Sequence, residues 1–116
     1  MSKIIIWHNQ ECSKSRMALS LLEEKKLDIK VIDYLEKAPS KEEIVVLLKM
    51  LHISARALMR TKEEIYTTLN LQEETEEVKL IEAMHIHPIL IERPIIIKED
   101  KAVIARPFEN LVELLK

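Results

Sequence analysis

The hydrophobic pattern at the start of the chain predicts a strand, a helix and a second strand. Residues 3–8 contain an unbroken apolar run, Ile4 to Trp7, which is short and mostly β-branched and is therefore typical of a buried strand. From Ser13 to Lys26 the apolar residues recur every three or four positions, which indicates an amphipathic helix. Apolar and polar residues alternate over Ile29–Tyr34. These elements form a βαβ unit, whose two strands are parallel and joined by a right-handed crossover.

The middle of the chain is predicted to be helical. Ser40, followed three positions later by Glu43, is a capping box that opens a helix after the loop Leu35–Pro39. Helical spacing then predicts three further segments, at Ser54–Leu58, Lys62–Leu69 and Glu76–Met84.

The last third returns to short apolar runs that are typical of strands. These runs are Ile89–Ile91, Ile95–Ile97 and Ala102–Ala105, with a turn at Glu99–Lys101 and a closing helix at Phe108–Leu115. The last two strands form a hairpin. The whole order predicts an α/β protein with a mixed sheet: one thioredoxin-like domain over residues 1–116, with a helical insertion at about residues 40–86.

The composition narrows the classes of function. The chain's 116 residues suit one domain, and 47% of them are hydrophobic, which is typical of a globular protein. The chain has no glycine, so it carries neither the Gly-rich dinucleotide loop nor the Walker phosphate loop. Its net charge of -2 indicates no nucleic-acid surface and no basic membrane patch. We expect no direct nucleic-acid partner and no membrane association.

The chain has one cysteine, Cys12, so no disulfide within the chain can stabilise the fold. Such a cysteine usage is typical of the reducing cytosol. The apolar run at Ile4–Trp7 is too short for the core of a signal peptide, and no apolar run approaches the length of a membrane span. We therefore expect a cytoplasmic protein.

Cys12 is the strongest candidate for chemistry. It falls between the first strand and the first helix, where the helix N-terminus stabilises a thiolate and lowers the pKa of the thiol. The alternative is an inert buried cysteine, but the polar neighbours, such as Asn9 and Lys14, favour the reactive form. A Cys-x-x-Cys pair is excluded because Ser15 takes the second position. If Cys12 is oxidised during turnover, an outside thiol must reduce it.

Three arginines are candidates for binding an anion beside the thiolate. Arg60 ends a predicted helical segment, whereas Arg93 and Arg106 each precede a proline, which favours an extended backbone. Guanidinium groups bind tetrahedral oxyanions through two parallel hydrogen bonds. Each arginine alone also fits an ordinary surface residue.

The histidines give weaker signals. His8 ends the first strand and can either shape the electrostatics of the cysteine loop or be a passive loop residue. His85 and His87 lie two positions apart, but two ligands without a third make a poor metal site, so we predict no metal.

Five segments, in this order, resemble the glutaredoxin-coupled arsenate reductases of bacteria over nearly the whole chain. They are His8-Asn9-x-x-Cys12-x-x-Ser15-Arg16, Asp33-Tyr34-Leu35-Glu36, Ile53-Ser54-x-Arg56-x-Leu58-x-Arg60, His87-Pro88-Ile89-Leu90-Ile91-x-Arg93-Pro94-Ile95 and Arg106-Pro107.

The resemblance implies a reaction and a set of roles. The Cys12 thiolate would attack arsenate, which would be held by arginines at the positions of Arg60, Arg93 and Arg106, while His8 and Ser15 would lower the pKa of the thiol. Glutathione would be the co-substrate, glutaredoxin would be the protein partner, and no cofactor would be bound. The resemblance also implies a cis peptide bond before Pro94.

The chain departs from the family pattern in its anion loop. Gln10 stands where these enzymes carry proline, and Ser13 stands where they often carry glycine, which lets the backbone approach an oxyanion closely. Two alternatives to arsenate reduction therefore stay open. One is a redox-regulatory protein of the same superfamily that binds RNA polymerase, and the other is a thiol protein that accepts glutathione without oxyanion chemistry.

Overall fold

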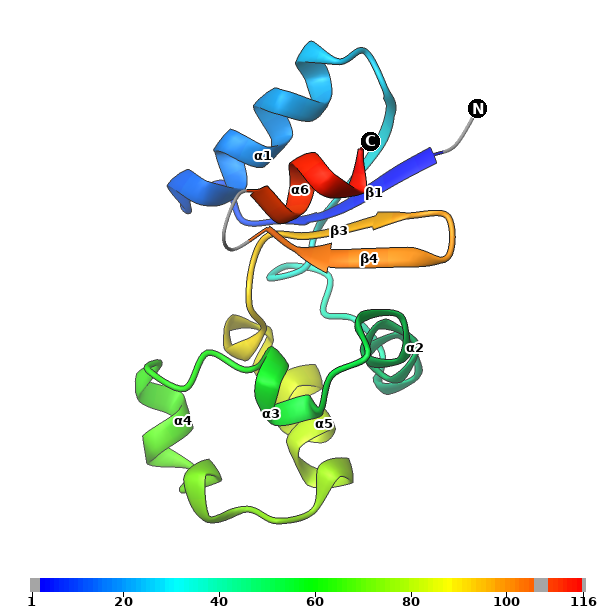
Figure 1. Cartoon of the computed structure of the whole chain (residues 1–116). Helices are drawn as coiled ribbons and strands as arrows, with labels where there is room; N and C mark the ends of the chain where they lie inside the picture. Colours follow the sequence, from blue (N-terminus) through cyan, green and yellow to red (C-terminus); the bar gives the residue numbers. More distant parts are fainter. Residues whose placement is uncertain (1–2, 106–108, 116) are drawn as a thin grey trace. The chain divides into compact units, whose positions relative to one another are not determined.

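The computed structural model describes residues 3–105 and 109–115, which form short strands and helices (Figure 1). In chain order the elements are β1 (Lys3–His8), α1 (Ser13–Glu24), β2 (Asp28–Asp33), α2 (Lys41–Leu51), α3 (Ala55–Leu58), α4 (Glu64–Thr68), the 3₁₀ helix η1 (Leu71–Glu73), α5 (Glu77–Ile86), the 3₁₀ helix η2 (Pro88–Leu90), β3 (Ile95–Lys98), β4 (Lys101–Ile104) and α6 (Glu109–Leu114).

The chain divides into two compact units. The first consists of Met1–Lys37 together with Arg93–Lys116 and contains the whole sheet, whereas the second is Ala38–Glu92 and contains α2 to η2. The second unit covers the segment that the sequence predicts as a helical insertion.

The first unit contains a four-stranded sheet in the order β2-β1-β3-β4. The two strands of the βαβ unit, β1 and β2, are parallel, and β3 and β4 form an antiparallel hairpin beside β1, as the sequence predicts. Trp7, near the end of β1, is paired with Ile32 of β2 on one side and with Ile95 of β3 on the other. This arrangement is the thioredoxin-like fold.

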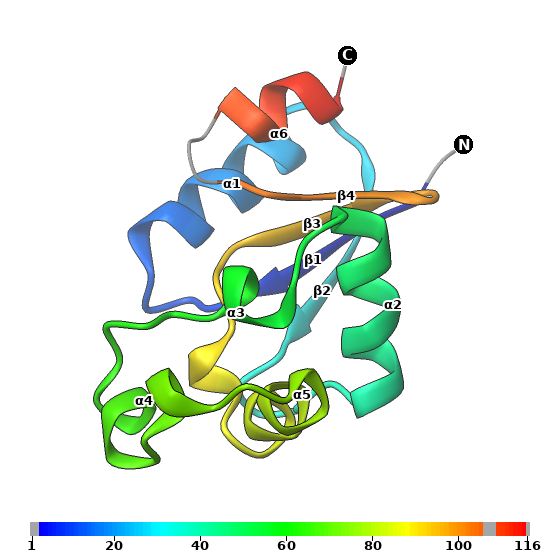
Figure 2. The ribbon, with the colours of Figure 1, turned by 60° about the horizontal axis from the view of Figure 1, so that its bottom comes forward.

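The core of the first unit lies between the sheet and two helices. Figure 2 shows α1 and α6 on the same side of the sheet. Apolar side chains from both helices meet those of the strands there, because each helix has one apolar face to bury. The fully buried members of this core are Ile4, Ile6, Ala18, Leu22, Ile96, Ala105 and Leu111.

In the second unit α2 begins with the predicted capping box. The Ser40 hydroxyl accepts a hydrogen bond from the Glu43 backbone N–H, and the Glu43 carboxylate accepts one from the Ser40 backbone N–H. Helices α2 and α5 pack together, and each contributes buried apolar residues, such as Ile44 in α2 and Met84 in α5. The Nδ1 atom of His85 lies 2.7 Å from the Pro39 carbonyl and ties the end of α5 to the segment before α2.

One predicted strand is wrong. Residues Ile89–Ile91 do not form a strand, because Pro88 opens the 3₁₀ helix η2 and only Ile91 pairs with another segment, through an isolated bridge to Met59. Leu90 and Ile91 are both completely buried. The apolar run therefore indicated a buried segment but not its conformation. Proline has a fixed φ that suits the first position of a helix, and this favoured the 3₁₀ turn over a strand.

Among the residues that the structure describes, four have a left-handed backbone, and none of them is glycine. Lys26, His52, Asn70 and Glu99 have φ values between 56° and 58°. Lys26 follows α1, which ends at Glu24 and not at the predicted Lys26, and Glu99 lies in the turn of the β3–β4 hairpin. Glycine takes this conformation most readily, so a chain without glycine adopts it at some energetic cost.

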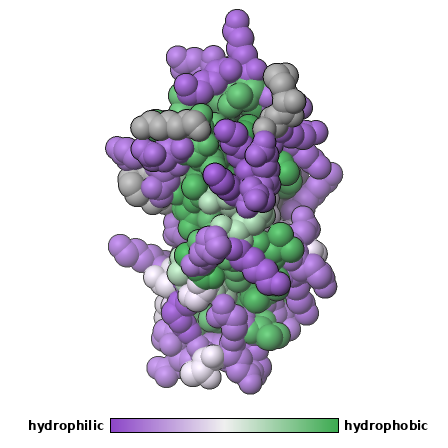
Figure 3. Space-filling model, turned by 45° about the vertical axis from the view of Figure 1, so that its right-hand side comes forward, coloured by the Kyte–Doolittle hydropathy of each residue, from purple (hydrophilic) through white to green (hydrophobic). Residues whose placement is uncertain are grey.

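Hydrophilic side chains cover most of the face drawn in Figure 3, and hydrophobic ones show in patches between them. Within the described ranges, 3–105 and 109–115, no helix has the length and apolar character that a membrane span requires.

Candidate active site

The loop after β1 places Cys12 at the N-cap of α1. The Cys12 N–H donates to the Asn9 carbonyl at 3.0 Å, and the Asn9 side-chain oxygen accepts from the Glu11 N–H at 3.0 Å, so the loop folds back on itself. The Cys12 carbonyl accepts the first hydrogen bond of the helix, from the Arg16 N–H at 3.0 Å. A tight turn of this kind presents the cysteine side chain to the unpaired N–H groups of the first helical turn.

The surroundings of Cys12 favour the thiolate. Burial raises the pKa of the Cys12 thiol, but this effect is outweighed by hydrogen bonds from the Ser15 backbone, the Arg93 side chain and the Lys14 backbone and by the charge of Arg93, which together lower the pKa to about 7. The first turn of α1 contains no acidic residue that would oppose the positive end of the helix. A thiol with this pKa is about half thiolate at neutral pH and is a ready nucleophile.

Arg93 is the cation that the sheet brings to Cys12. It lies two residues before β3, whose first residue, Ile95, is paired with Trp7 near the end of β1. The guanidinium donates a hydrogen bond to the Cys12 sulfur. The Arg93–Pro94 peptide bond is cis, which is the isomer that the resemblance implies.

His8 and Ser15 form a buried polar pair beside the cysteine. The Nδ1 atom of His8 lies 2.7 Å from the Ser15 hydroxyl, which also accepts a hydrogen bond from the Asn9 N–H at 3.0 Å. Burial lowers the pKa of His8, Asp33 raises it and Arg16 lowers it, with a net decrease. The imidazole is therefore neutral at pH 7, and its contact with Ser15 fastens the end of β1 to the first turn of α1.

Tyr34 belongs to the same group of residues, although neither its residue type nor the resemblance predicted a role for it. Its side chain is 1% exposed and stacks on Trp7, with ring centroids 6.5 Å apart. Its hydroxyl lies near the Arg93 guanidinium and helps to raise the pKa of that group. The signal that could have found it is its position as the last residue of the predicted second strand. The carboxyl ends of parallel strands meet at one edge of a sheet, and a buried tyrosine hydroxyl usually has a polar partner.

For the other two arginines, proximity to Cys12 stays a prediction. Arg60 belongs to the second unit, where its backbone N–H donates to the Leu90 carbonyl at 2.7 Å. Its guanidinium is paired with Glu63, and the Nε and Nη2 atoms lie 3.2 Å and 3.1 Å from the same carboxylate oxygen. Arg106 lies outside the described residues. The convergence of three arginines on the thiolate therefore stays a prediction.

The two residues that depart from the family pattern are both part of the cysteine loop and helix. The exposed Gln10 accepts a hydrogen bond at its carbonyl from the Arg16 guanidinium at 3.3 Å. Ser13 is the first residue of α1 and its side chain is exposed.

Within the parts of the chain that the structure describes, no three residues of the metal-binding types, His, Cys, Asp and Glu, gather into a possible metal site. His85 contacts the Pro39 carbonyl, and His87 caps the C-terminal end of α5.

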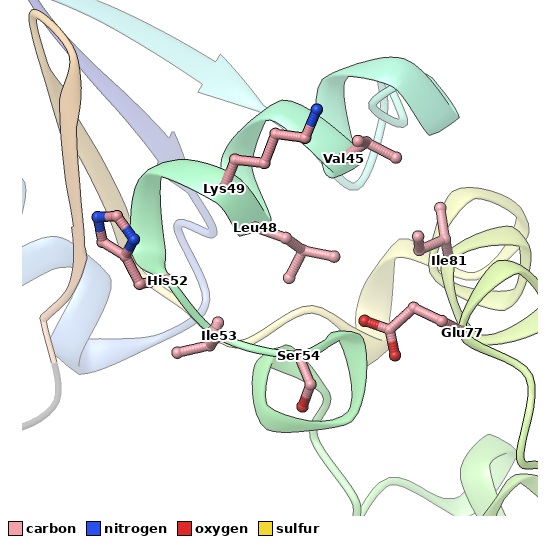
Figure 4. Close-up of a pocket in the computed structure, with 8 residues that line it drawn as sticks. All are labelled: Val45, Leu48, Lys49, His52, Ile53, Ser54, Glu77 and Ile81. Atoms are coloured by element: carbon pink, nitrogen blue, oxygen red, sulfur yellow. The ribbon is translucent and has the colours of Figure 1, made fainter.

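The second unit contains an open pocket of about 520 Å³ (Figure 4). Its wall is largely aliphatic, and the Leu48 and Ile81 side chains point toward its interior in Figure 4. The Glu77 carboxylate at its rim accepts a hydrogen bond from the Ala55 N–H at 2.8 Å and so caps α3. The residues that line it are Val45, Leu48, Lys49, His52, Ile53, Ser54, Glu77 and Ile81.

Comparison with known proteins identifies the family. The model of the ArsC family matches residues 7–114, a range that includes Cys12, Tyr34 and Arg93. This chain belongs to the ArsC family. The family assignment confirms the resemblance drawn from the five sequence segments.

Several relatives match this ArsC protein over nearly its whole length. An arsenate reductase of Haemophilus influenzae is 45% identical, with 97% of this chain and 98% of the relative covered. The uncharacterized protein YfgD of Escherichia coli is 44% identical, with 97% of each chain covered. The solved structure of an arsenate reductase from Vibrio cholerae is 44% identical and superposes with a TM-score of 0.92, again over 97% of each chain. The thioredoxin-like fold is thereby confirmed.

Proposed function

We propose that this ArsC protein reduces arsenate to arsenite, with the Cys12 thiolate as nucleophile and glutathione and glutaredoxin as the reductants. The observation that carries the proposal is the contact between Arg93 and the Cys12 sulfur at the N-terminus of α1. A positive group beside a thiolate both activates the nucleophile and attracts an oxyanion. Relatives that are named arsenate reductase and match nearly the whole chain support the choice of oxyanion.

The first step forms a bond between sulfur and arsenic. The Cys12 sulfur attacks the arsenic of arsenate, and one arsenate oxygen takes up protons and leaves as water. The adduct is still As(V), so no electrons have been transferred at this stage. In this proposal Arg93, together with Arg60 and Arg106, binds the remaining arsenate oxygens and neutralises their charge.

The second step transfers two electrons. Glutathione adds, its sulfur pairs with that of Cys12, and arsenic keeps the electron pair of its former bond to sulfur, so that it leaves as As(III). The product on the protein is a mixed disulfide between Cys12 and glutathione. Glutaredoxin then reduces this disulfide and restores the thiolate. The chain has no second cysteine for that task, so the thiols come from the surrounding solution, as they would in the cytoplasm.

The experiment that tests the proposal is a coupled assay of arsenate-dependent NADPH oxidation with glutathione, glutathione reductase and glutaredoxin. We expect turnover to need every component and to disappear in Cys12→Ser. Turnover that persists in Cys12→Ser would refute the nucleophile assignment.

A second candidate function is a thiol protein that accepts glutathione without reducing arsenate. It is favoured by the similarity to YfgD, whose name assigns it no activity. Intact-mass measurement after treatment with oxidised glutathione would show an adduct on Cys12, and arsenate would not slow alkylation of Cys12. Absence of turnover combined with a stable complex with RNA polymerase would instead favour a regulatory protein.

A further inference from the structure

The edge of the sheet that carries Cys12 also carries Arg93 and Tyr34. His8, the last residue of β1, lies opposite Asp33, the last residue of β2, so Tyr34 leaves the sheet beside the loop that leads to Cys12. Because β3 runs antiparallel to β1, the segment just before Ile95 reaches the same edge. Three segments that are distant in sequence therefore deliver a thiol, a guanidinium and a phenol to one place.

Tyr34 is held rigidly at this edge. Its side chain is 1% exposed, and its ring packs on that of Trp7 with an angle of 27° between the planes. A buried ring of this size loses most of its freedom through packing alone, and its hydroxyl then has a fixed position. The neutral phenol oxygen is an acceptor, so it can receive an N–H of the guanidinium without neutralising its charge.

We propose that Tyr34 is a positioning residue, whose hydroxyl holds the Arg93 guanidinium against the Cys12 sulfur. Arginine has a long and flexible side chain, and restraining it costs conformational entropy. The interaction with the Tyr34 hydroxyl restrains the Arg93 side chain before the reaction begins, so the guanidinium stays where it stabilises the thiolate. The inference rests on the part of the proposed function that makes Cys12 the nucleophile, but not on the identity of the oxyanion.

The test measures how fast iodoacetamide alkylates Cys12 between pH 5 and pH 9 in the full chain. In Tyr34→Phe we expect the apparent pKa of the thiol to rise by about half a unit, which lowers the thiolate fraction at pH 6 about threefold. In Arg93→Met the rise is larger, and adding Tyr34→Phe to Arg93→Met changes nothing further, because Tyr34 acts through Arg93. No arsenate is needed, so failure of this inference is distinct from failure of the proposed reaction.

Tyr66→Phe is the matched control. Tyr66 is the other tyrosine of the chain, is also buried, and accepts a hydrogen bond from an arginine, Arg56, within the second unit. We expect this variant to leave the alkylation profile of Cys12 unchanged. A wild-type profile in Tyr34→Phe, a shift that persists in the Arg93→Met background, or an equal shift in Tyr66→Phe would each overturn the inference.

A second measurement leaves Tyr34 intact and so does not depend on the folding of a Tyr34 variant. The Tyr66→Phe protein is labelled with carbon-13 tyrosine, so that its one labelled ring reports Tyr34. We expect the resonance of the ring carbon that bears the hydroxyl to titrate together with the Cys12 thiol, and to lose that titration when Arg93→Met is added. A resonance that does not respond to the thiol in the presence of Arg93 would contradict the proposed contact.

Discussion

Arg93 and Arg60 are both predicted to bind the oxyanion, yet their surroundings in the two units differ. Arg93, in the first unit, interacts with the Cys12 thiol and with the Tyr34 hydroxyl. Arg60, in the second unit, donates two N–H groups to one oxygen of the Glu63 carboxylate. Arg93 therefore faces the nucleophile itself, whereas Arg60 faces a carboxylate that takes no part in the reaction.

This difference indicates two distinct roles. A guanidinium beside a thiol determines how much of that thiol is ionised, so Arg93 acts before any substrate arrives. A guanidinium that is already paired with a carboxylate attracts an anion less strongly, because an incoming oxyanion has to compete with that carboxylate. We therefore expect Arg93 to control the nucleophile and Arg60 to affect only the binding of the oxyanion.

The largest expected effect is that of pH on the reactivity of Cys12, the residue beside Arg93. With a pKa of about 7 the Cys12 thiol is mostly thiolate above that pH and loses its reactivity as the pH falls through it. Alkylation by iodoacetamide should therefore slow about a hundredfold between pH 8 and pH 5, because only the thiolate reacts. A profile that rises only toward pH 9, as for an unperturbed cysteine, would contradict this description of the site.

The next effect separates the two arginines. Arg93→Met should raise the pKa of the Cys12 thiol by about one unit, and so reduce alkylation at pH 6 about tenfold, because both a hydrogen bond and a charge are removed. Arg60→Met should leave the alkylation profile unchanged while raising KM for arsenate. Equal shifts of the thiol pKa in both variants would remove the distinction between the two regions.

The smallest expected effect concerns Glu63, whose carboxylate competes with arsenate for the Arg60 guanidinium. Glu63→Gln keeps the shape of the side chain but removes its charge, and we expect KM for arsenate to fall about threefold, in line with a half-buried ion pair. The thiol pKa should not change. Glu64→Gln is the matched control, since it makes the same change of charge at the adjacent exposed position. An equal decrease of KM in both variants would show that general charge, and not the pair with Arg60, is responsible.

Much of the fold could be predicted because periodicity and capping are local signals. The βαβ unit, the capping box at Ser40 and the final hairpin follow from the spacing of apolar residues and from a few polar side chains. The strand predicted at Ile89–Ile91 failed because a short apolar run is equally compatible with a buried turn. Its conformation depends on Pro88 and on pairing with Met59, which is distant in sequence.

The parts of the site that depend on residue type and on position along the chain could be predicted. Cys12 at a helix N-terminus and an arginine before a cis proline could both be inferred from the sequence and the resemblance. The contact of Tyr34 with Arg93 could not, because it depends on the register of three strands. The pairing of Arg60 with Glu63 was also missed, since two residues three positions apart can meet or point apart according to the local turn.

The four left-handed residues of this glycine-free chain leave it a way to become more stable. At Lys26, His52, Asn70 and Glu99 the side chain disfavours the backbone conformation by about 1 kcal/mol each, and glycine would relieve most of that cost. All four lie near helix ends or in the hairpin turn, and none is a sequence neighbour of Cys12, Tyr34 or Arg93. The chain can therefore gain stability by single changes away from its chemistry, and a lineage that acquired them could tolerate more destabilising mutations around the cysteine while new oxyanion preferences arise.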